Sequence, residues 1–184
     1  MKLILFIYLF IFFFLQNNGY TSNKDNIVKK LNTINNLSFN FIQTVGGKDE
    51  KGQCVIQYPK KIFCEYEKRN KKIMVSNGRT LVIKSNKQYY RYPIKSTPLE
   101  YLLDKKYLIN KINSSKLSEV EDKYMFIQII ENNNNINVFF SKKNFELIGW
   151  QIEDVYQNLA VTYIFDTLIN KNINEKLFKL PKQD

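Results

Sequence analysis

The chain has 184 residues, a length that suits one domain, and 44% of them are hydrophobic, which is enough for a sizeable core. It contains no histidine, so the sequence excludes the most common general base and the most common metal ligand of proteins. The formal net charge is +11, and we discount part of this basicity because Asn and Ile are abundant as well as Lys.

The N-terminus predicts a secretory signal peptide. Lys2 is followed by thirteen apolar or aromatic residues, Leu3 to Leu15, and then by a polar stretch. A helix that spans a bilayer needs about 20 residues, so this run is short for a membrane anchor, which is the alternative. We therefore expect an exported protein with a signal peptide at residues 1–22 and one domain at residues 23–184.

The first predicted element of that domain is a helix over residues 24–36. Ile27, Leu31 and Ile34 recur at helical spacing and give it one apolar face. A strand over residues 38–45 follows. An ordinary helix packed on a sheet explains this pattern, and a helix that also forms the wall of a cavity is the alternative.

A run of short strands comes next, after a loop predicted over residues 46–51. The predicted strands are 52–58, 62–66, 73–76, 80–84 and 88–92. Asn77 and Gly78 both tolerate positive φ, as a two-residue type I′ hairpin requires. The pattern predicts an antiparallel meander that turns one face to water and the other to a core or a cargo.

The only two cysteines, Cys54 and Cys64, lie on either side of a predicted turn at Pro59. This turn places them opposite each other, on the face that also holds Ile56 and Ile62. Opposed strand residues have Cα separations of about 4.5–5.5 Å, which suits a disulfide, and exported proteins meet oxidising surroundings. We favour a disulfide, with two free buried thiols as the alternative. Two thiols without histidine are too few ligands for a metal site.

A helix interrupts the meander after the fifth short strand. Thr97, Pro98 and Glu100 are typical of a helix start with a capping box, and three leucines follow on one face. Residues 107–112 extend this helical character. Because the helix interrupts a meander, we expect it to lie across a face of the sheet rather than beside an edge.

The rest of the chain returns to strands, so the whole is an α+β fold. The predicted strands are 116–121, 123–131, 136–141, 145–153 and 159–169, with a short tail at 173–181. We expect an incomplete, half-open antiparallel β-barrel of about nine to eleven strands, its concave face covered by two or three helices that form a lid. A sheet too wide to be filled by its own side chains encloses a cavity, and apolar walls suit acyl chains.

Catalytic motifs are absent from the sequence, including G-x-S-x-G, the P-loop and H-E-x-x-H. We therefore expect neither an enzyme nor a cofactor. Nucleic-acid binding would require aromatic residues interleaved with cations, which only residues 89–92 approach. An export signal argues against that partner, and an anionic membrane surface or an acidic protein fits a basic exported protein better.

Several short motifs, each weak alone, occur along the chain in a particular order. They are F-x-Q at Phe41 and Gln43, Gly52, Pro59, FCEY at 63–66, VSNG-x-T-L at 75–81 and TPLEYLL at 97–103. Their order resembles the LolA family, the periplasmic carriers of outer-membrane lipoproteins. The resemblance implies an incomplete barrel with a helical lid over a hydrophobic cavity, a periplasmic location, and three partners: lipoprotein acyl chains, an inner-membrane lipoprotein-releasing transporter and an outer-membrane lipoprotein acceptor.

The resemblance also implies roles for single residues. Leu31 would meet the lid, and Ile62 would lie near the mouth of the cavity. Well-studied family members have an arginine before the turn proline, where it holds the lid closed. Here that position is Tyr58, which has one hydrogen-bond donor and no charge. We expect the cavity and lid to be lined by Leu31, Phe39, Phe41, Ile56, Tyr58, Ile62, Leu81, Ile83, Leu99, Leu102, Leu103 and Trp150.

Taken together, these features favour a monomeric periplasmic chaperone that shields the acyl chains of lipoproteins and delivers them from the inner to the outer membrane. An exported half-barrel that senses or scaffolds, binding a protein partner or a lipid without transport, is the alternative. The third hypothesis is an exported hydrolase, against which the absence of histidine argues.

Overall fold

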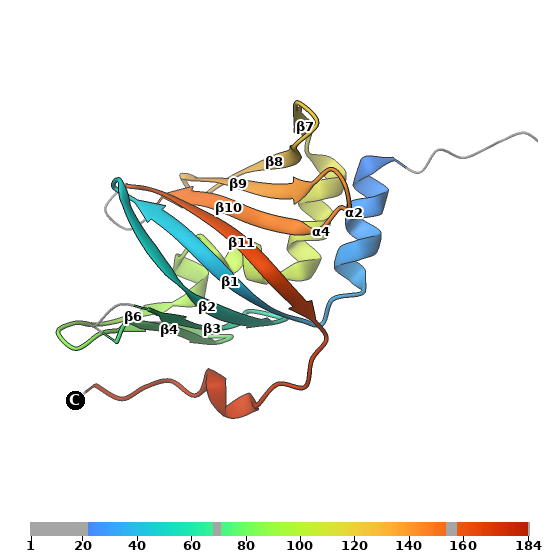
Figure 1. Ribbon diagram of the computed structural model, residues 1–184. Coiled ribbons are helices and arrows are strands. Elements are labelled where there is room, and N and C mark those ends of the chain that lie inside the picture. The colour runs from blue at the N-terminus through green and yellow to red at the C-terminus, as the bar shows by residue number, and fades with distance from the viewer. Residues whose placement is uncertain (1–21, 68–70, 154–157, 184) are drawn as a thin grey trace, which may run out of the picture.

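A single curved antiparallel sheet forms the frame of the molecule (Figure 1). The computed structural model describes residues 22–67, 71–153 and 158–183, so the predicted signal peptide lies almost wholly outside the described residues. Within these ranges the sheet has eleven strands in the order β6-β5-β4-β3-β2-β1-β11-β10-β9-β8-β7. The strands are β1 Asn36–Val45, β2 Lys48–Gln57, β3 Lys61–Tyr66, β4 Ile73–Asn77, β5 Thr80–Lys84, β6 Tyr89–Pro93, β7 Leu117–Val120, β8 Tyr124–Glu131, β9 Asn134–Ser141, β10 Leu147–Glu153 and β11 Leu159–Ile169.

The sheet does not close on itself. Strand β6 forms one edge and the four-residue strand β7 forms the other, while β1 pairs with β2 on one side and with β11 on the other. Every second side chain of β1 from Leu37 to Phe41 is buried on the inner face, so this strand contributes to the core where the two halves of the sheet meet. The half-open antiparallel barrel predicted from the sequence is confirmed.

Helices lie on the inner side of the bend (Figure 1). They are α2 Asn23–Asn32, α3 Leu99–Leu103 and α4 Lys105–Ser114, with the short 3₁₀ turn η1 at Ile94–Ser96. A second 3₁₀ turn, η2 at Glu175–Phe178, lies on the outer side of the sheet. Helices α2 and α4 lie side by side, and α4 also contacts β8. Among the described helices, none is long and apolar enough to cross a membrane.

The helix ends differ from the sequence prediction. Helix α2 stops at Asn32 rather than at 36, because Asn36 already pairs with β2. The capping box predicted at Thr97 is wrong: the Thr97 hydroxyl donates to the carbonyl of Ile94 at 2.8 Å and so closes turn η1 instead. The side chain of Asp104 provides the cap between the two lid helices, accepting from the amide of Tyr107 at 3.1 Å.

Two turns also differ. Residues 48–51 belong to β2, and the connection from β1 is only Gly46-Gly47, both at positive φ (54° and 73°), as a type I′ turn requires. At Asn77-Gly78 only Gly78 has positive φ, so the predicted type I′ hairpin is wrong. The side chain of Asn77 accepts from two following amides and makes a wider turn.

The C-terminal segment crosses the outer face of the sheet under β3 and β4 (Figure 1). Phe178 in η2 is buried, and Glu175 pairs with Lys61 at 2.8 Å. Val75 and Val82 face this side and are almost fully buried, whereas an uncovered outer face would be exposed. We name residues 170–183 the C-terminal strap, because they seal this face of the sheet.

Candidate ligand-binding pocket

An open pocket of about 410 Å³ lies on the inner face of the sheet. Its volume is within the range of about 300–1,000 Å³ that is usual for small-molecule sites. It is lined by Phe41, Gln43, Val45, Glu50, Cys54, Cys64, Tyr66, Lys72, Met74, Leu81, Ile83, Gln88, Tyr90, Tyr92, Thr97, Pro98, Leu99, Trp150, Ile152, Ala160 and Thr162. Most of these side chains are aromatic or aliphatic, and the start of α3 forms the wall at one end.

Aromatic rings and a disulfide form much of the wall. The ring of Phe41 meets that of Tyr66 edge to face, with centroids 5.1 Å apart, and Gly52 makes this possible. A Cβ at Gly52 would stand 2.8 Å from the Phe41 ring and 2.2 Å from a strand carbonyl. Cys54 and Cys64 pair directly across β2 and β3, 4.1 Å apart at Cα, and their sulfur atoms form a disulfide. The pocket wall here is therefore covalently tied.

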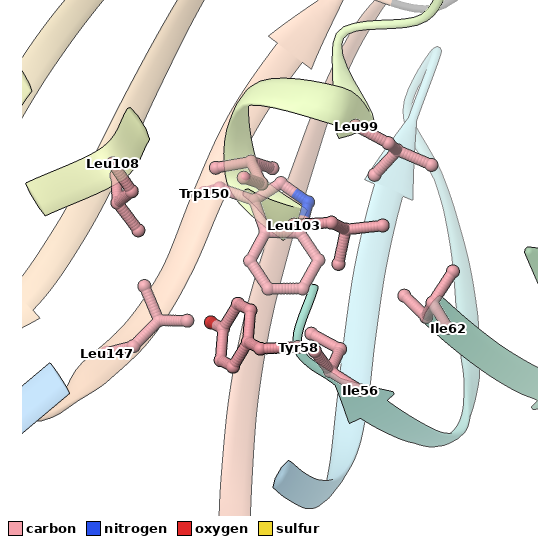
Figure 2. Close-up of a pocket in the computed structure, with 9 residues that line it drawn as sticks. Ile56, Tyr58, Ile62, Leu99, Leu103, Leu108, Leu147 and Trp150 are labelled. Carbon is pink, nitrogen blue, oxygen red and sulfur yellow. The ribbon is translucent and has the colours of Figure 1, made fainter. Parts of the chain in front are cut away.

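A second group of apolar side chains lies beneath α3 and is closely packed (Figure 2). It consists of Ile56, Tyr58, Ile62, Leu99, Leu102, Leu103, Leu108, Leu147 and Trp150. The free volume among them is about 10 Å³, which is room for one water molecule at most. In Figure 2 the Tyr58 ring lies between Leu147 and Ile56, below Trp150. We call this group the packed region.

The twelve residues expected to line the cavity divide between these two places. Phe41, Leu81, Ile83, Leu99 and Trp150 line the open pocket; Ile56, Tyr58, Ile62, Leu99, Leu102, Leu103 and Trp150 line the packed region. The remaining two, Leu31 and Phe39, are buried elsewhere in the core, with Phe39 edge-on to the Trp150 ring at 6.1 Å. Ile62, expected near the mouth, is fully buried beneath α3.

Sequence reasoning missed the polar end of the pocket. Here the ammonium of Lys72 lies 2.6 Å from a carboxylate oxygen of Glu50 and 4.1 Å from the centroid of the Tyr66 ring. The amide nitrogen of Gln43 donates to the hydroxyl of Thr162 at 2.9 Å. The alternation Ile62, Cys64, Tyr66 was a signal for the tyrosine, but no local pattern joins Glu50 to Lys72.

Tyr66 stays uncharged at this polar end. Burial, with the nearby Glu50 carboxylate as a second cause, raises the pKa of the Tyr66 phenol well above its usual value. Its hydroxyl donates to the Gln43 side-chain oxygen at 3.5 Å. The polar end is thus a set of hydrogen-bonding groups with one ion pair. Among the residues that the structure describes, no group of three or more His, Cys, Asp or Glu could hold a metal ion.

A family model described as "Outer membrane lipoprotein carrier protein LolA" matches residues 32–181, which is most of the chain. The chain belongs to the LolA family. No curated protein matches it significantly in sequence. The solved structures that it resembles, at 8–11% identity, are similar to it in fold alone.

Three solved structures are among those similar to this LolA-family chain. An uncharacterised conserved protein from Thermus thermophilus has 8% identity and a TM-score of 0.51, over 86% of this chain and 93% of that one. A LolA superfamily protein from Nitrosomonas europaea has 10% identity and a TM-score of 0.44, over 85% and 97%. MucB has 9% identity and a TM-score of 0.48, over 90% and 64%.

In this LolA-family chain a lysine joins the turn at Pro59 to the lid helix α3. The amide of Lys60 donates to the carbonyl of Leu103 at 2.8 Å. Its ammonium lies 2.8 Å from the carboxylate of Glu100 and 3.2 Å from that of Asp104. Lys60 thus holds both backbone and side chains of the lid, two residues after Tyr58. We call these contacts the Lys60 clamp.

Proposed function

We propose that this protein is a periplasmic carrier that shields the acyl chains of lipoproteins and delivers them from the inner to the outer membrane. In this proposal residues 1–22 are a signal peptide, and residues 23–184 form the carrier domain. The observation that carries it is an open, largely apolar pocket on the concave face of a LolA-family sheet, next to a short lid helix. Each methylene group buried there would contribute about 0.8 kcal/mol.

The packed region supports a role for α3 as a movable lid. The leucines of α3 lie beside Trp150, which also borders the open pocket, so an outward shift of α3 would make room for a second acyl chain. An inner-membrane transporter would drive that shift during loading, and an outer-membrane acceptor would take the cargo. No covalent step is needed, and the pocket offers no histidine for one.

A large side chain introduced on β11 and directed into the pocket tests the proposal. Ala160 is buried and lines the pocket, while its neighbour Val161 faces the other side of β11. We expect Ala160→Trp to weaken binding of a dye-labelled triacylated lipopeptide at least about tenfold, since the indole would occupy the site. Fluorescence anisotropy gives the affinity.

Val161→Trp is the matched control, because it adds the same side chain on the outer face. It should leave the affinity unchanged. Equal affinities of the two variants and the parent would place the lipid outside the pocket. Failure of the parent protein to bind the lipopeptide at all would remove the carrier function itself.

An outer-face surface favours the second candidate, a scaffold that binds a protein partner. Four apolar side chains of β11 are 44–54% exposed on this strand: Leu159, Tyr163, Phe165 and Leu168. The Tyr163 ring stacks on Phe139 across the strand that contains Gly149. If the protein is such a scaffold, the double substitution Tyr163→Ser and Phe165→Ser should abolish binding of the protein partner and leave lipopeptide binding unchanged.

A further inference from the structure

The polar end of the pocket lies at the opposite end of strands β2 and β3 from the lid. The β2–β3 turn contacts α3 through the Lys60 clamp, whereas Glu50 stands near the start of β2 and Tyr66 ends β3. Six residues of strand separate Lys60 from Tyr66, or about 20 Å. An elongated ligand would therefore have one end under α3 and the other beside Lys72.

This end of the pocket is open to solvent. The side chains of Lys72 and Glu50 are 24% and 19% exposed, while Leu99 at the lid end is almost buried. Burying a charged or strongly polar head group beneath α3 would be costly, because the wall there is formed by leucine and tryptophan. The head of an amphiphile is thus best placed at the mouth, among the polar side chains.

Charge at the mouth is already balanced. The Lys72 ammonium has its counter-charge in Glu50 at 2.6 Å, so it offers little net attraction to a second anion. A carboxylate entering beside Lys72 would also approach Glu50, and like charges at such distances repel. A carbonyl oxygen meets no such penalty. It can accept from the remaining ammonium protons of Lys72 or from the second proton of the Gln43 amide, whose first proton goes to Thr162.

We propose that this end of the pocket recognises the neutral ester or amide group of an acylated molecule, and that Glu50 excludes free fatty acids. Glu50 is then a specificity-determining residue and Lys72 a hydrogen-bond donor to the head-group carbonyl. The inference rests on the proposed acyl-binding function and specifies its ligand: an esterified or amide-linked acyl chain, as a lipoprotein carries, and not a free acid.

The test compares two ligands of equal chain length at pH 7. Dodecanoic acid and its monoglyceride ester, both below the concentrations at which they aggregate, compete with a neutral fluorescent acyl ester bound to the purified protein. The ester should bind about threefold to tenfold more tightly than the acid. Glu50→Gln should strengthen binding of the acid by a similar factor, because Lys72 would then be unpaired, and leave the ester nearly unchanged.

Two further variants separate this role from a structural one. Glu65→Gln makes the same change of charge on the exposed, outward-facing side of β3 and should keep the parental preference. Lys72→Met should weaken binding of the ester, because the head-group carbonyl would lose a hydrogen-bond donor. Unfolding midpoints in urea show that each variant is folded.

The proposal fails if acid and ester compete equally in the parent protein, or if Glu50→Gln leaves their ratio unchanged. Failure of the parent protein to bind the fluorescent ester is a different result. It would remove acyl binding altogether and with it the proposed function, before the question of the head group arises.

Discussion

At the scale of single residues, the β2–β3 turn is joined to α3 by the Lys60 clamp, and not by the position directly before the turn proline, where the resemblance places an arginine in other family members. Tyr58 stands in that position, but its ring is part of the packed region and lies 5.7 Å below the ammonium of Lys105. Lys60 instead reaches α3, and the hydrogen bond to Glu100, with Asp104 as a further partner, raises its pKa above the ordinary value. One positive charge on the β2–β3 turn is thus paired with two carboxylates of α3 and its C-cap.

Lys60→Met should loosen the lid without unfolding the protein. The ammonium and its partners are partly exposed, so we expect a loss of about 0.5–1 kcal/mol in the free energy of unfolding. Hydrogen exchange at the amides of α3 should quicken more than exchange in β1. Lys123→Met, which breaks an exposed pair with Glu121, is the control and should change neither.

Tyr58 predicts a pH dependence in the alkaline range. Burial raises its pKa from 10.0 to about 12 in the folded state. The folded protein therefore keeps the phenol proton between pH 10 and 12 while the unfolded chain loses it, and stability contributed by this group falls as pH rises through that window. Below pH 10 the contribution is complete.

Tyr58→Phe should remove this part of the alkaline destabilisation. The measurement is the difference between parent and variant in the free energy of unfolding at pH 9, 10.5 and 11.5, which cancels the titration of other tyrosines and lysines. A constant difference across the series would mean that the Tyr58 phenol ionises equally in both states.

At the scale of elements, the C-terminal strap is the least expected feature. The sequence predicted only a short tail at 173–181, because an irregular segment has no periodicity to reveal where it will lie. Its burial of Phe178 and its hydrogen bonds to β2 and β6 side chains attach it to the sheet. Strands β3 and β4 therefore have their outer face covered by the strap.

Phe178→Ala should destabilise the protein by about 3 kcal/mol, as for other buried aromatic side chains. Urea unfolding followed by circular dichroism measures the loss. Leu177→Ala, at the half-buried neighbour, should cost clearly less. If the two variants are equally stable, the strap does not seal the sheet in solution.

At the scale of the whole molecule, most of the strand order was predictable because antiparallel meanders pair neighbours in sequence. Alternation from Ile62 to Tyr66 and from Thr80 to Lys84 marks strands whose partners follow directly along the chain. The pocket was less predictable. Ile62 and Leu81 have the same local pattern, yet one lies under α3 and the other borders open space.

The polar end of the pocket illustrates the same limit more strongly. Glu50 lies in a charged run that was interpreted as a loop, and Lys72 lies outside every predicted strand. Only the pairing of β2 with β3, and the return of the chain to β4, bring the two charges to 2.6 Å. Long-range register is information that no short stretch of sequence contains.

A ligand bound in the pocket should stabilise the whole fold, since it contacts strands from both halves of the sheet. A ligand at one hundred times its dissociation constant adds about 2.7 kcal/mol to the free energy of unfolding. The glyceryl ester should therefore raise the thermal midpoint of the parent protein. Ala160→Trp should show no such rise, and a rise of the same size there would indicate binding at another surface.

The packed region beneath α3 has a consequence for the empty state of the protein. Ile62, Leu102 and Leu103 line the packed region, which has room for one water molecule at most, so this part of the apolar lining is packed against itself when no cargo is present. In the proposed carrier role, an unloaded molecule that buries this surface internally would diffuse between two membranes without adhering to either, and the extra space would open only where a partner moves α3.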